Sequence, residues 1–389
     1  MQAGIYIHVP FCKSRCIYCD FYSTTAEKQR RRYAEAVKRE LEARKDFLGT
    51  REIATVYLGG GTPSQLALAE LEEIFSSIRE RFAVAADAEI TIEANPDDVT
   101  EEWCAGIVRL GFNRVSLGIQ SFDDNILKFI RRRHTARQAR EAVELLASHV
   151  GNISIDLIYG LPGQSPDLWE SDLQQAFALP VKHLSAYALS IEEGAPLWQM
   201  VRQRKIEETD EETERTMYEL LMDTAEAHGF EHYELSNFAL PGYRSRHNSS
   251  YWHDVPYLGL GPGAHSYDGA ARYANRPDLN AYLAAPEKCL VKECLSENER
   301  FNDYVFTALR TADGLPLDSL AERFGEAAKN NLLNTAKSRL AAGFLELCGH
   351  AAEAVDGRGG LGSGRAERCA GMEFGTYRVC ERRRQPRPH

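Results

Sequence analysis

The sequence predicts an α/β protein, a partial (β/α)6 barrel followed by a small C-terminal helical domain. Short β-rich runs alternate with helical runs through the first two-thirds of the 389 residues. Alternation of this kind predicts a parallel sheet, and several strand runs are apolar on both faces, as a sheet covered on each side requires. The residues suited to chemistry follow directly after strand runs, at the edge where α/β proteins bind ligands.

The predicted strands are short runs rich in β-branched and aromatic residues. They cover residues 4–9, 53–58, 89–94, 114–119, 153–158, 183–189 and 230–235. The stretches between them have helical periodicity at 25–48, 68–82, 100–111 and 135–148. Gly111 ends the third of these helices in the usual manner. We therefore predict that residues 1–235 form the barrel and that 236–295 form a connecting segment.

The character of the chain changes near residue 296. Apolar residues recur at intervals of three and four from 296 to 350, which predicts a small separate helical domain. The Gly- and Arg-rich residues 351–389 show no sustained period. This composition predicts an irregular tail, either disordered or produced by a shifted reading frame.

Composition restricts the classes of partner and compartment. The formal net charge is −11, which argues against nucleic acid as a partner. No run approaches the ~18 apolar residues of a membrane span, and the first residues lack the features of a signal peptide. We expect a cytoplasmic protein, in which clustered cysteines stay reduced and serve metal or redox chemistry.

Three cysteines, Cys12, Cys16 and Cys19, follow the first strand with the spacing C-x3-C-x2-C. The spacing favours a [4Fe–4S] cluster, while a structural zinc site and unmetallated thiols remain as alternatives. Zinc sites and iron–sulfur clusters both usually take four protein ligands. Three thiolates on a cluster leave one iron open to a small molecule that binds through an amine and a carboxylate.

The run "YIHVPFCKSRCIYCDF" resembles the radical S-adenosylmethionine (SAM) superfamily, and within it the branch of oxygen-independent coproporphyrinogen III oxidases and HemW-type heme chaperones. The resemblance covers residues 3–348. It implies that Cys12, Cys16 and Cys19 bind a [4Fe–4S] cluster and that SAM occupies the fourth iron.

Three further motifs match the SAM site of the superfamily. "LGGGTPS" supplies Gly60, Gly61 and Thr62; the residues alone also fit a tight turn, but not a P-loop, because no Gly-Lys-Ser/Thr follows. "IEANPDD" supplies Glu93, whose alternative role is that of a helix-capping acid. "LGIQSFDD" supplies Gln120 after the next strand. The resemblance implies that these residues contact SAM.

The remaining SAM residues come from later strands and one loop. "IRRRHT" supplies Arg132, although Arg131 stands where relatives often have glycine, so the register between the two arginines stays open; a solvated basic face is the alternative. Asp156 lies in an otherwise apolar strand, where a charge is costly unless paired. The resemblance implies that Asp156 bonds the SAM ribose and that Tyr6 and Ala188 also contact SAM.

Two features separate the chaperones from the oxidases. The oxidases carry one more cysteine, at the position of Phe21 here, and an N-terminal extension for which we expect no counterpart. "HNSSYW" fits the H-N-x-x-Y-W pattern of HemW-type chaperones, which implies that His247 ligates heme iron; a polar corner on a packed loop is the alternative. His265 is a second candidate axial ligand.

The sequence therefore predicts a heme chaperone that passes heme to apo-hemoproteins. By resemblance, the acceptors are respiratory membrane cytochromes, with transient membrane association. An oxygen-independent coproporphyrinogen III oxidase is the enzymatic alternative, and a zinc-stabilised α/β protein is the third. Whether the chain forms a homodimer stays open.

Overall fold

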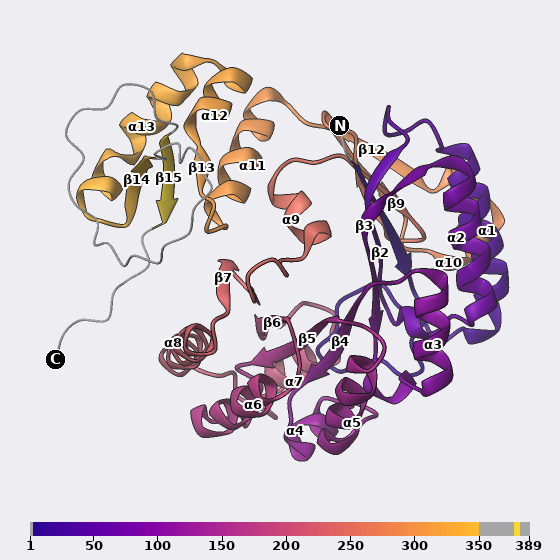
Figure 1. The fold of residues 1–389 in the computed structure, drawn as a ribbon. Helices are drawn as coiled ribbons and strands as arrows, with labels where there is room; N and C mark the ends of the chain where they lie inside the picture. Colours follow the sequence, from indigo (N-terminus) through magenta and orange to yellow (C-terminus); the bar gives the residue numbers. More distant parts are fainter. Residues whose placement is uncertain (1–2, 350–376, 382–389) are drawn as a thin grey trace, which may run out of the picture. The chain divides into compact units, whose positions relative to one another are not determined.

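The computed structural model describes residues 3–349 and 377–381 (Figure 1). The chain divides into two compact units, one covering Met1–Ser296 and the other Glu297–His389. The first unit therefore includes residues 236–295, which the sequence analysis treated as a connecting segment.

The first unit is built on one 12-stranded sheet. Its six leading strands are parallel and adjacent in chain order, from β1 to β6. They are β1 (Ala3–Val9), β2 (Glu52–Gly60), β3 (Ala83–Ala94), β4 (Arg114–Gln120), β5 (Asn152–Tyr159) and β6 (His183–Ala188). The predicted partial barrel is thus confirmed, and the sheet does not close on itself.

Short strands extend both edges of this parallel core. At one edge, β9 (Tyr257–Leu260) pairs parallel with β1, and β10 (His265–Tyr267), β11 (Ala271–Asn275) and β12 (Leu290–Cys294) follow in antiparallel order. At the other edge, β8 (Asn237–Ala239) and β7 (Glu231–Glu234) are antiparallel additions. Most of the segment 236–295 therefore extends the sheet.

Helices cover the outer, convex side of the sheet (Figure 1). They are α1 (Arg30–Ala43), α2 (Leu68–Arg81), α3 (Glu101–Leu110), α4 (Asp124–Phe129), α5 (Ala136–Ala147) and α6 (Pro166–Ala178). The others of this unit are α7 (Pro196–Arg202), α8 (Glu211–Ala227), α9 (Arg246–Trp252) and α10 (Leu279–Ala284). Unlike α1 to α6, α9 lies on the concave side of the sheet, where it contacts β2 (Figure 1).

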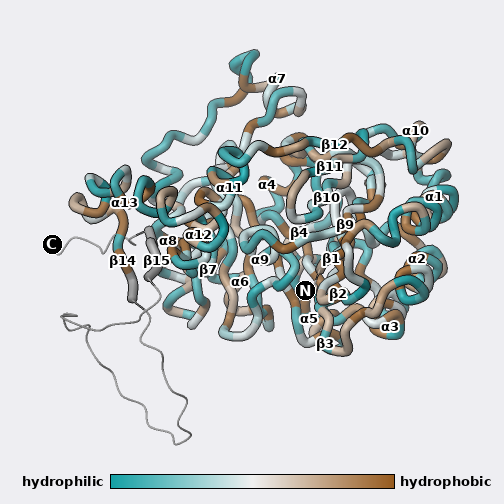
Figure 2. Tube along the Cα trace, turned by 90° about the horizontal axis from the view of Figure 1, so that it is seen from above, coloured by the Kyte–Doolittle hydropathy of each residue, from teal (hydrophilic) through white to brown (hydrophobic). Residues whose placement is uncertain are grey.

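Strand alternation separates an apolar outer face from a polar inner face. Ile5, Ile7, Val56 and Leu58 are buried with the helices in one continuous apolar core, and hydrophilic residues line the outer turns of α1 (Figure 2). The alternate positions point inward and are polar: Tyr6, His8, Tyr57, Glu93, Arg114, Ser116, Asp156 and Ser185. A polar interior is the arrangement of a barrel that encloses a ligand rather than side chains alone.

Capping residues that can be recognised in the sequence mark the ends of several helices. Thr100 accepts a hydrogen bond from the backbone N–H of Trp103 at the start of α3. Gly111 ends the same helix with φ of 96°, a left-handed conformation that glycine adopts at low cost. Thr135 and Gln138 form a capping box at the start of α5.

The second unit contains α11 (Glu297–Leu309), α12 (Leu317–Phe324) and α13 (Glu326–Ala341). Ala308, Leu315, Leu317 and Leu320 form its small apolar core. These helices lie within residues 296–350, which the sequence analysis expected to be helical.

A three-stranded sheet in this unit was not expected. β15 (Tyr377–Glu381) pairs antiparallel with β14 (Leu345–Gly349) and with β13 (Leu315–Pro316). β15 lies inside the tail that the sequence analysis expected to be irregular; the rest of that tail, 350–376 and 382–389, lies outside the described residues. Within the part of the chain that the structure describes, no helix combines the length and apolar character needed to cross a membrane.

Candidate functional site

The cysteine loop begins where β1 ends and returns to the same point. Phe11 forms a bridge with Thr24, the backbone N–H of Cys12 donates to the Thr24 carbonyl at 2.9 Å, and the Thr24 N–H donates to the Pro10 carbonyl at 2.7 Å. These bonds close the loop at its base. The three cysteines are therefore held at the carboxyl end of β1, as the sequence predicts for a ligand-binding edge.

The three thiols lie within electrostatic reach of one another. Burial raises the pKa of Cys12, and the nearby Cys16 adds to this shift. Burial also raises the pKa of Cys19 to about 11, with Cys16 and Cys12 adding repulsion. The Thr62 hydroxyl donates to Cys12 Sγ at 3.5 Å, and Arg132 Nη1 donates to Cys16 Sγ at 3.6 Å. Donors aimed at sulfur stabilise thiolates and are the outer-shell contacts that metal-bound thiolates receive.

The donor set fits an iron–sulfur cluster held at three corners. Three cysteines share the loop, and the side chain at the fourth position of the oxidase pattern, Phe21, is 61% exposed and cannot ligate metal. Among the described residues, no three His, Cys, Asp or Glu side chains are gathered closely enough to hold a single metal ion. In a cluster, by contrast, each thiolate binds a separate iron.

The glycine loop follows β2 and packs directly against β1. Gly60 has φ of 107°, and a Cβ there would lie 2.5 Å from the ring of His8; a Cβ on Gly61 would lie 2.8 Å from the Val9 carbonyl. The N–H of Gly61 donates to that carbonyl at 2.8 Å. Both positions thus require glycine for close backbone approach, and Thr62 is thereby placed beside the cysteine loop.

Two carboxylates point into the interior below the loops. Glu93 accepts hydrogen bonds from Tyr57 Oη at 2.8 Å and from the Gly60 N–H at 3.1 Å. Burial raises the pKa of Glu93 to about 7, and the charge of Asp156 adds to the shift. Burial also raises the pKa of Asp156, which accepts from Ser116 Oγ at 3.1 Å. Each carboxylate would be stabilised by a cationic or hydroxyl-bearing ligand.

Gln120 and Arg132 come from the end of β4 and the loop after α4. Gln120 has φ of 74°, an uncommon conformation for a residue with a side chain. Arg132 Nη2 donates to Asn95 Oδ1 at 2.6 Å and also to the Gly118 carbonyl. Arg131 has φ of 61°, which explains why glycine suits that position. Arg132 is therefore the arginine that reaches the cysteine loop.

Tyr6 and Ala188 complete the residues that the resemblance implied for SAM. Tyr6 is on the inner face of β1 and shares a hydrogen bond with His8 Nδ1 at 3.1 Å, while burial raises its pKa. Ala188 is the last residue of β6, paired with Tyr159. The structure thus brings the cysteines, the glycine loop and the residues at the carboxyl ends of β3, β4 and β6 to one end of the sheet, with Asp156 deeper inside.

His247 is placed elsewhere, near the amino ends of the strands. Its Nδ1 shares a hydrogen bond with Thr55 Oγ1 at 2.7 Å and its Nε2 with Tyr251 Oη at 2.8 Å. The ring is fully buried and stacks on Tyr57 at a centroid distance of 5.1 Å. Burial, and the positive charge of Arg114, lower the pKa of His247 to about 3.

The H-N-x-x-Y-W segment forms α9, and a buried carboxylate holds its first turn. Glu89 accepts from the backbone N–H groups of Arg246 and His247, both at 3.0 Å. In this structure both ring nitrogens of His247 are hydrogen-bonded within the chain. Heme ligation by His247 stays a prediction, as does the packed polar corner that the sequence left as its alternative.

Arg114 is an interior residue that the sequence analysis missed. It is 1% exposed, and its Nε and Nη1 have no hydrogen-bond partner among the described residues. Its charge acts on Glu93, Asp156 and His247. One feature of the sequence could have identified Arg114: it is a charged residue at the start of the otherwise apolar run "RVSLGI". A charge in an otherwise apolar strand also identified Asp156.

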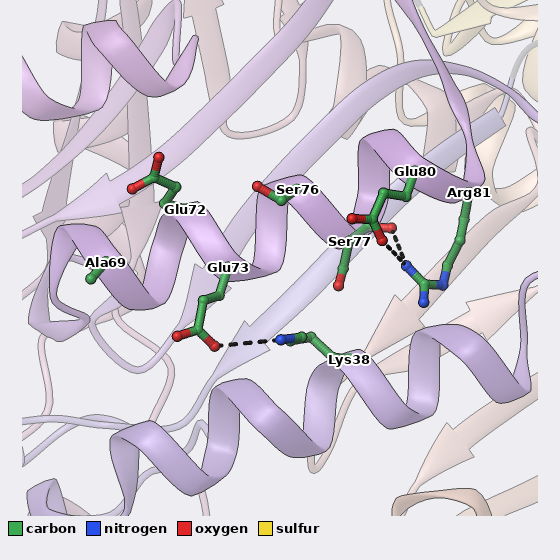
Figure 3. Close-up of a pocket in the computed structure, with 8 residues that line it drawn as sticks. All are labelled: Lys38, Ala69, Glu72, Glu73, Ser76, Ser77, Glu80 and Arg81. Carbon is green, nitrogen blue, oxygen red and sulfur yellow. Dashed lines mark hydrogen bonds and ion pairs between the residues drawn. The ribbon is translucent and has the colours of Figure 1, made fainter.

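A surface cavity of about 500 Å³ lies between α1 and α2 (Figure 3). It is lined by Lys38, Ala69, Glu72, Glu73, Ser76, Ser77, Glu80 and Arg81. Lys38 and Glu73 form an ion pair across it at 3.5 Å. The cavity lies in the outer helical layer and contains none of the predicted site residues, so it is separate from the site at the strand ends.

The chain resembles known proteins in sequence. The sequence model of the radical SAM superfamily matches residues 6–176. The heme chaperone HemW of Lactococcus lactis is 36% identical over 323 residues, covering 82% of this chain and 84% of the relative. The HemW of Mycobacterium tuberculosis is 37% identical over 355 residues, covering 89% of each chain.

One solved structure agrees with the fold over most of its length. Coproporphyrinogen III oxidase (HemN) from Escherichia coli superposes with a TM-score of 0.77 at 22% identity, covering 89% of this chain and 84% of that one. The fold and the three-cysteine loop thus define a radical SAM protein. Within that superfamily, the chain belongs to the HemW heme chaperone family.

Proposed function

We propose that this chain is a heme chaperone that binds heme and passes it to apo-hemoproteins. The observation that carries the proposal is its kinship with HemW heme chaperones over most of their length. Phe21 supports the same choice, because the sequence stops at three cysteines where the oxidase pattern has four. We include membrane respiratory cytochromes among the acceptors, reached from the cytoplasm by transient contact with the membrane.

The proposal includes a [4Fe–4S] cluster on Cys12, Cys16 and Cys19, with SAM as an exchangeable ligand of the fourth iron. When bound, such a cluster supplies one-electron chemistry to SAM. The residues of this chain would hold and orient the pair. Thr62 and Arg132 already donate to cysteine sulfurs, at 3.5 Å and 3.6 Å.

The two interior carboxylates would orient SAM itself. Glu93 and Asp156 are held by hydrogen bonds from the chain, and their raised pKa values show that the interior disfavours their charge. The sulfonium and ammonium groups of SAM would relieve that cost, and its ribose hydroxyls would donate to a carboxylate. Gln120 and Ala188, at neighbouring strand ends, would complete the SAM pocket.

A paired assay tests the proposal on the full chain, reconstituted anaerobically. Hemin is titrated while the Soret band is followed, and coproporphyrinogen III is supplied in parallel with SAM and a reductant. The proposal expects saturable heme binding, transfer of heme to an apo-hemoprotein, and no protoporphyrinogen. Formation of protoporphyrinogen without heme transfer would instead establish the oxidase. A colourless protein with stoichiometric zinc would establish the zinc-stabilised alternative.

A further inference from the structure

Asp172, on α6, is a buried carboxylate outside the proposed SAM pocket. It is 1% exposed. Its Oδ1 accepts from the backbone N–H of Phe122 at 2.7 Å, and its Oδ2 accepts from Ser121 Oγ at 2.8 Å and from Gln164 Nε2 at 3.3 Å. Burial raises the pKa of Asp172 to about 6, so the group is ionised at neutral pH. The three donors are buried as well, and they offset the cost of the buried charge.

Two of these donors directly follow Gln120, the last residue of β4. Gln120 has φ of 74°, and the register between β4 and β5 shifts between Gly118 and Gln120. A bulge of this kind re-aims a side chain. A positive φ persists in a residue with a side chain only where the surrounding structure holds it. The bonds from Ser121 and Phe122 to Asp172 fix the chain just beyond the bulge.

The bulge places the amide of Gln120 over Gly118, in the polar interior. A Cβ on Gly118 would lie 2.9 Å from Gln120 Nε2 and 3.2 Å from Arg132 Nη2. Gly118 is paired with Asp156 across β4 and β5. The Gln120 amide therefore lies beside Arg132, next to the strand that carries Asp156. Its direction depends on the backbone of Gln120, because side-chain direction is coupled to backbone conformation.

Gln164 extends the same contact to the loop after β5. Its Oε1 accepts from the Leu161 N–H at 3.2 Å, and its Nε2 donates to the Ile158 carbonyl at 3.4 Å as well as to Asp172. The carboxylate of Asp172 thus joins the loops that follow two neighbouring strands, β4 and β5.

We propose that Asp172 is a positioning residue for SAM: its carboxylate holds the two residues after Gln120, so that Gln120 keeps the turned backbone that presents its amide to the ligand. Asp172 acts through Gln120 and does not touch SAM, since both of its oxygens are bonded within the chain. This inference rests on the proposed SAM site, and it gives α6 a part in that site.

The test measures SAM affinity by calorimetry on the full chain, reconstituted anaerobically, for Asp172→Asn, Gln120→Ala and the double variant. An asparagine has one accepting oxygen and one donating NH₂ group, so it cannot accept at both positions as Asp172 does. Each single variant should weaken SAM binding about tenfold. The double variant should lose no more than the weaker of the two, because both changes remove the same contact. The iron content of all three should equal that of wild type.

Asp167→Asn is the matched control, because Asp167 lies on the same helix and is exposed; its SAM affinity should equal that of wild type. Ser121→Ala is a second, milder variant that removes one donor and leaves the Phe122 bond to Asp172. It should weaken SAM binding less than Asp172→Asn does and should be non-additive with Gln120→Ala in the same way. It therefore decides the question if Asp172→Asn does not fold.

The outcomes separate the inference from the site that it rests on. If wild type binds no SAM, the proposed SAM site fails and the role of Asp172 falls with it. If wild type binds SAM and Asp172→Asn keeps the wild-type affinity, the site stands and the role of Asp172 is overturned. Losses that add in the double variant would overturn it as well, because Asp172 would then act by a route that does not pass through Gln120.

Discussion

His247→Ala tests whether the H-N-x-x-Y-W segment acts through packing. The substitution removes the partner of Thr55 Oγ1 and of Tyr251 Oη, both bonded to the buried ring. Leaving a buried polar group unpaired costs about 1–3 kcal/mol each, and the cavity left by the ring adds about 1 kcal/mol. We therefore expect the free energy of unfolding to fall by about 3–7 kcal/mol.

This loss is large enough to measure by thermal unfolding. For a large domain each kcal/mol lowers the Tm by about 2 °C, so His247→Ala should melt about 6–14 °C below wild type. His228→Ala, at an exposed position where the ring stacks on Phe177 at 4.7 Å, should melt closer to wild type than His247→Ala does. His247→Gln, which keeps a hydrogen-bonding side chain, should fall between the two.

The measurement is a melt of each variant followed by circular dichroism, paired with a hemin titration below the transition. A folded His247→Ala protein should still bind heme. In the wild type, both ring nitrogens of His247 are bonded to Thr55 and Tyr251 rather than held available for iron. An unchanged melting temperature together with a lost Soret shift would refute this reasoning and would make His247 the iron ligand.

Three further predictions concern the strand ends. Burial raises the pKa of Glu93 from its ordinary value of 4.5 to about 7, so folding takes up a proton between these two pH values and stability is lost as the pH rises through this range. Glu93→Gln should gain about 2–3 kcal/mol relative to wild type between pH 5 and pH 8 in urea unfolding. Gly60→Ala meets a histidine ring at 2.5 Å with φ of 107°, whereas Gly163 has φ of 83° and nothing within 4 Å. The melting temperature should therefore fall further for Gly60→Ala than for Gly163→Ala, and equal losses would contradict the packing argument. Arg132→Lys loses the planar fork that joins Asn95 to Cys16, so SAM affinity by calorimetry should fall about tenfold while iron content is retained; unchanged affinity would remove Arg132 from the SAM site.

The parallel core could be predicted from sequence because each of its strands carries its own signal. Apolar runs between amphipathic helices located all six strands to within a few residues, with one exception. β3 begins at Ala83, six residues before the predicted start at 89, because its first residues pair with the beginning of β2. That pairing depends on the neighbouring strand and leaves no local pattern.

The candidate site was predicted where spacing or strand position carried the information. The cysteine loop, the glycine loop and Asp156 belong to this group. The burial of His247 could not be predicted, since it depends on Thr55, 192 positions earlier in the chain. The sheet of the second unit could not be predicted for the same reason. β14 pairs with β15, which follows it in the chain only after residues 350–376.

The proposed SAM site depends above all on a [4Fe–4S] cluster that is ligated by Cys12, Cys16 and Cys19 at three of its four irons. Elemental analysis of protein purified without oxygen, combined with electron paramagnetic resonance of the reduced form, tests it directly. We predict about four iron and four sulfide per chain, a cluster signal that changes when SAM is added, and loss of both metal and signal in Cys16→Ser. Protein that contains zinc but neither iron nor labile sulfide would contradict the account.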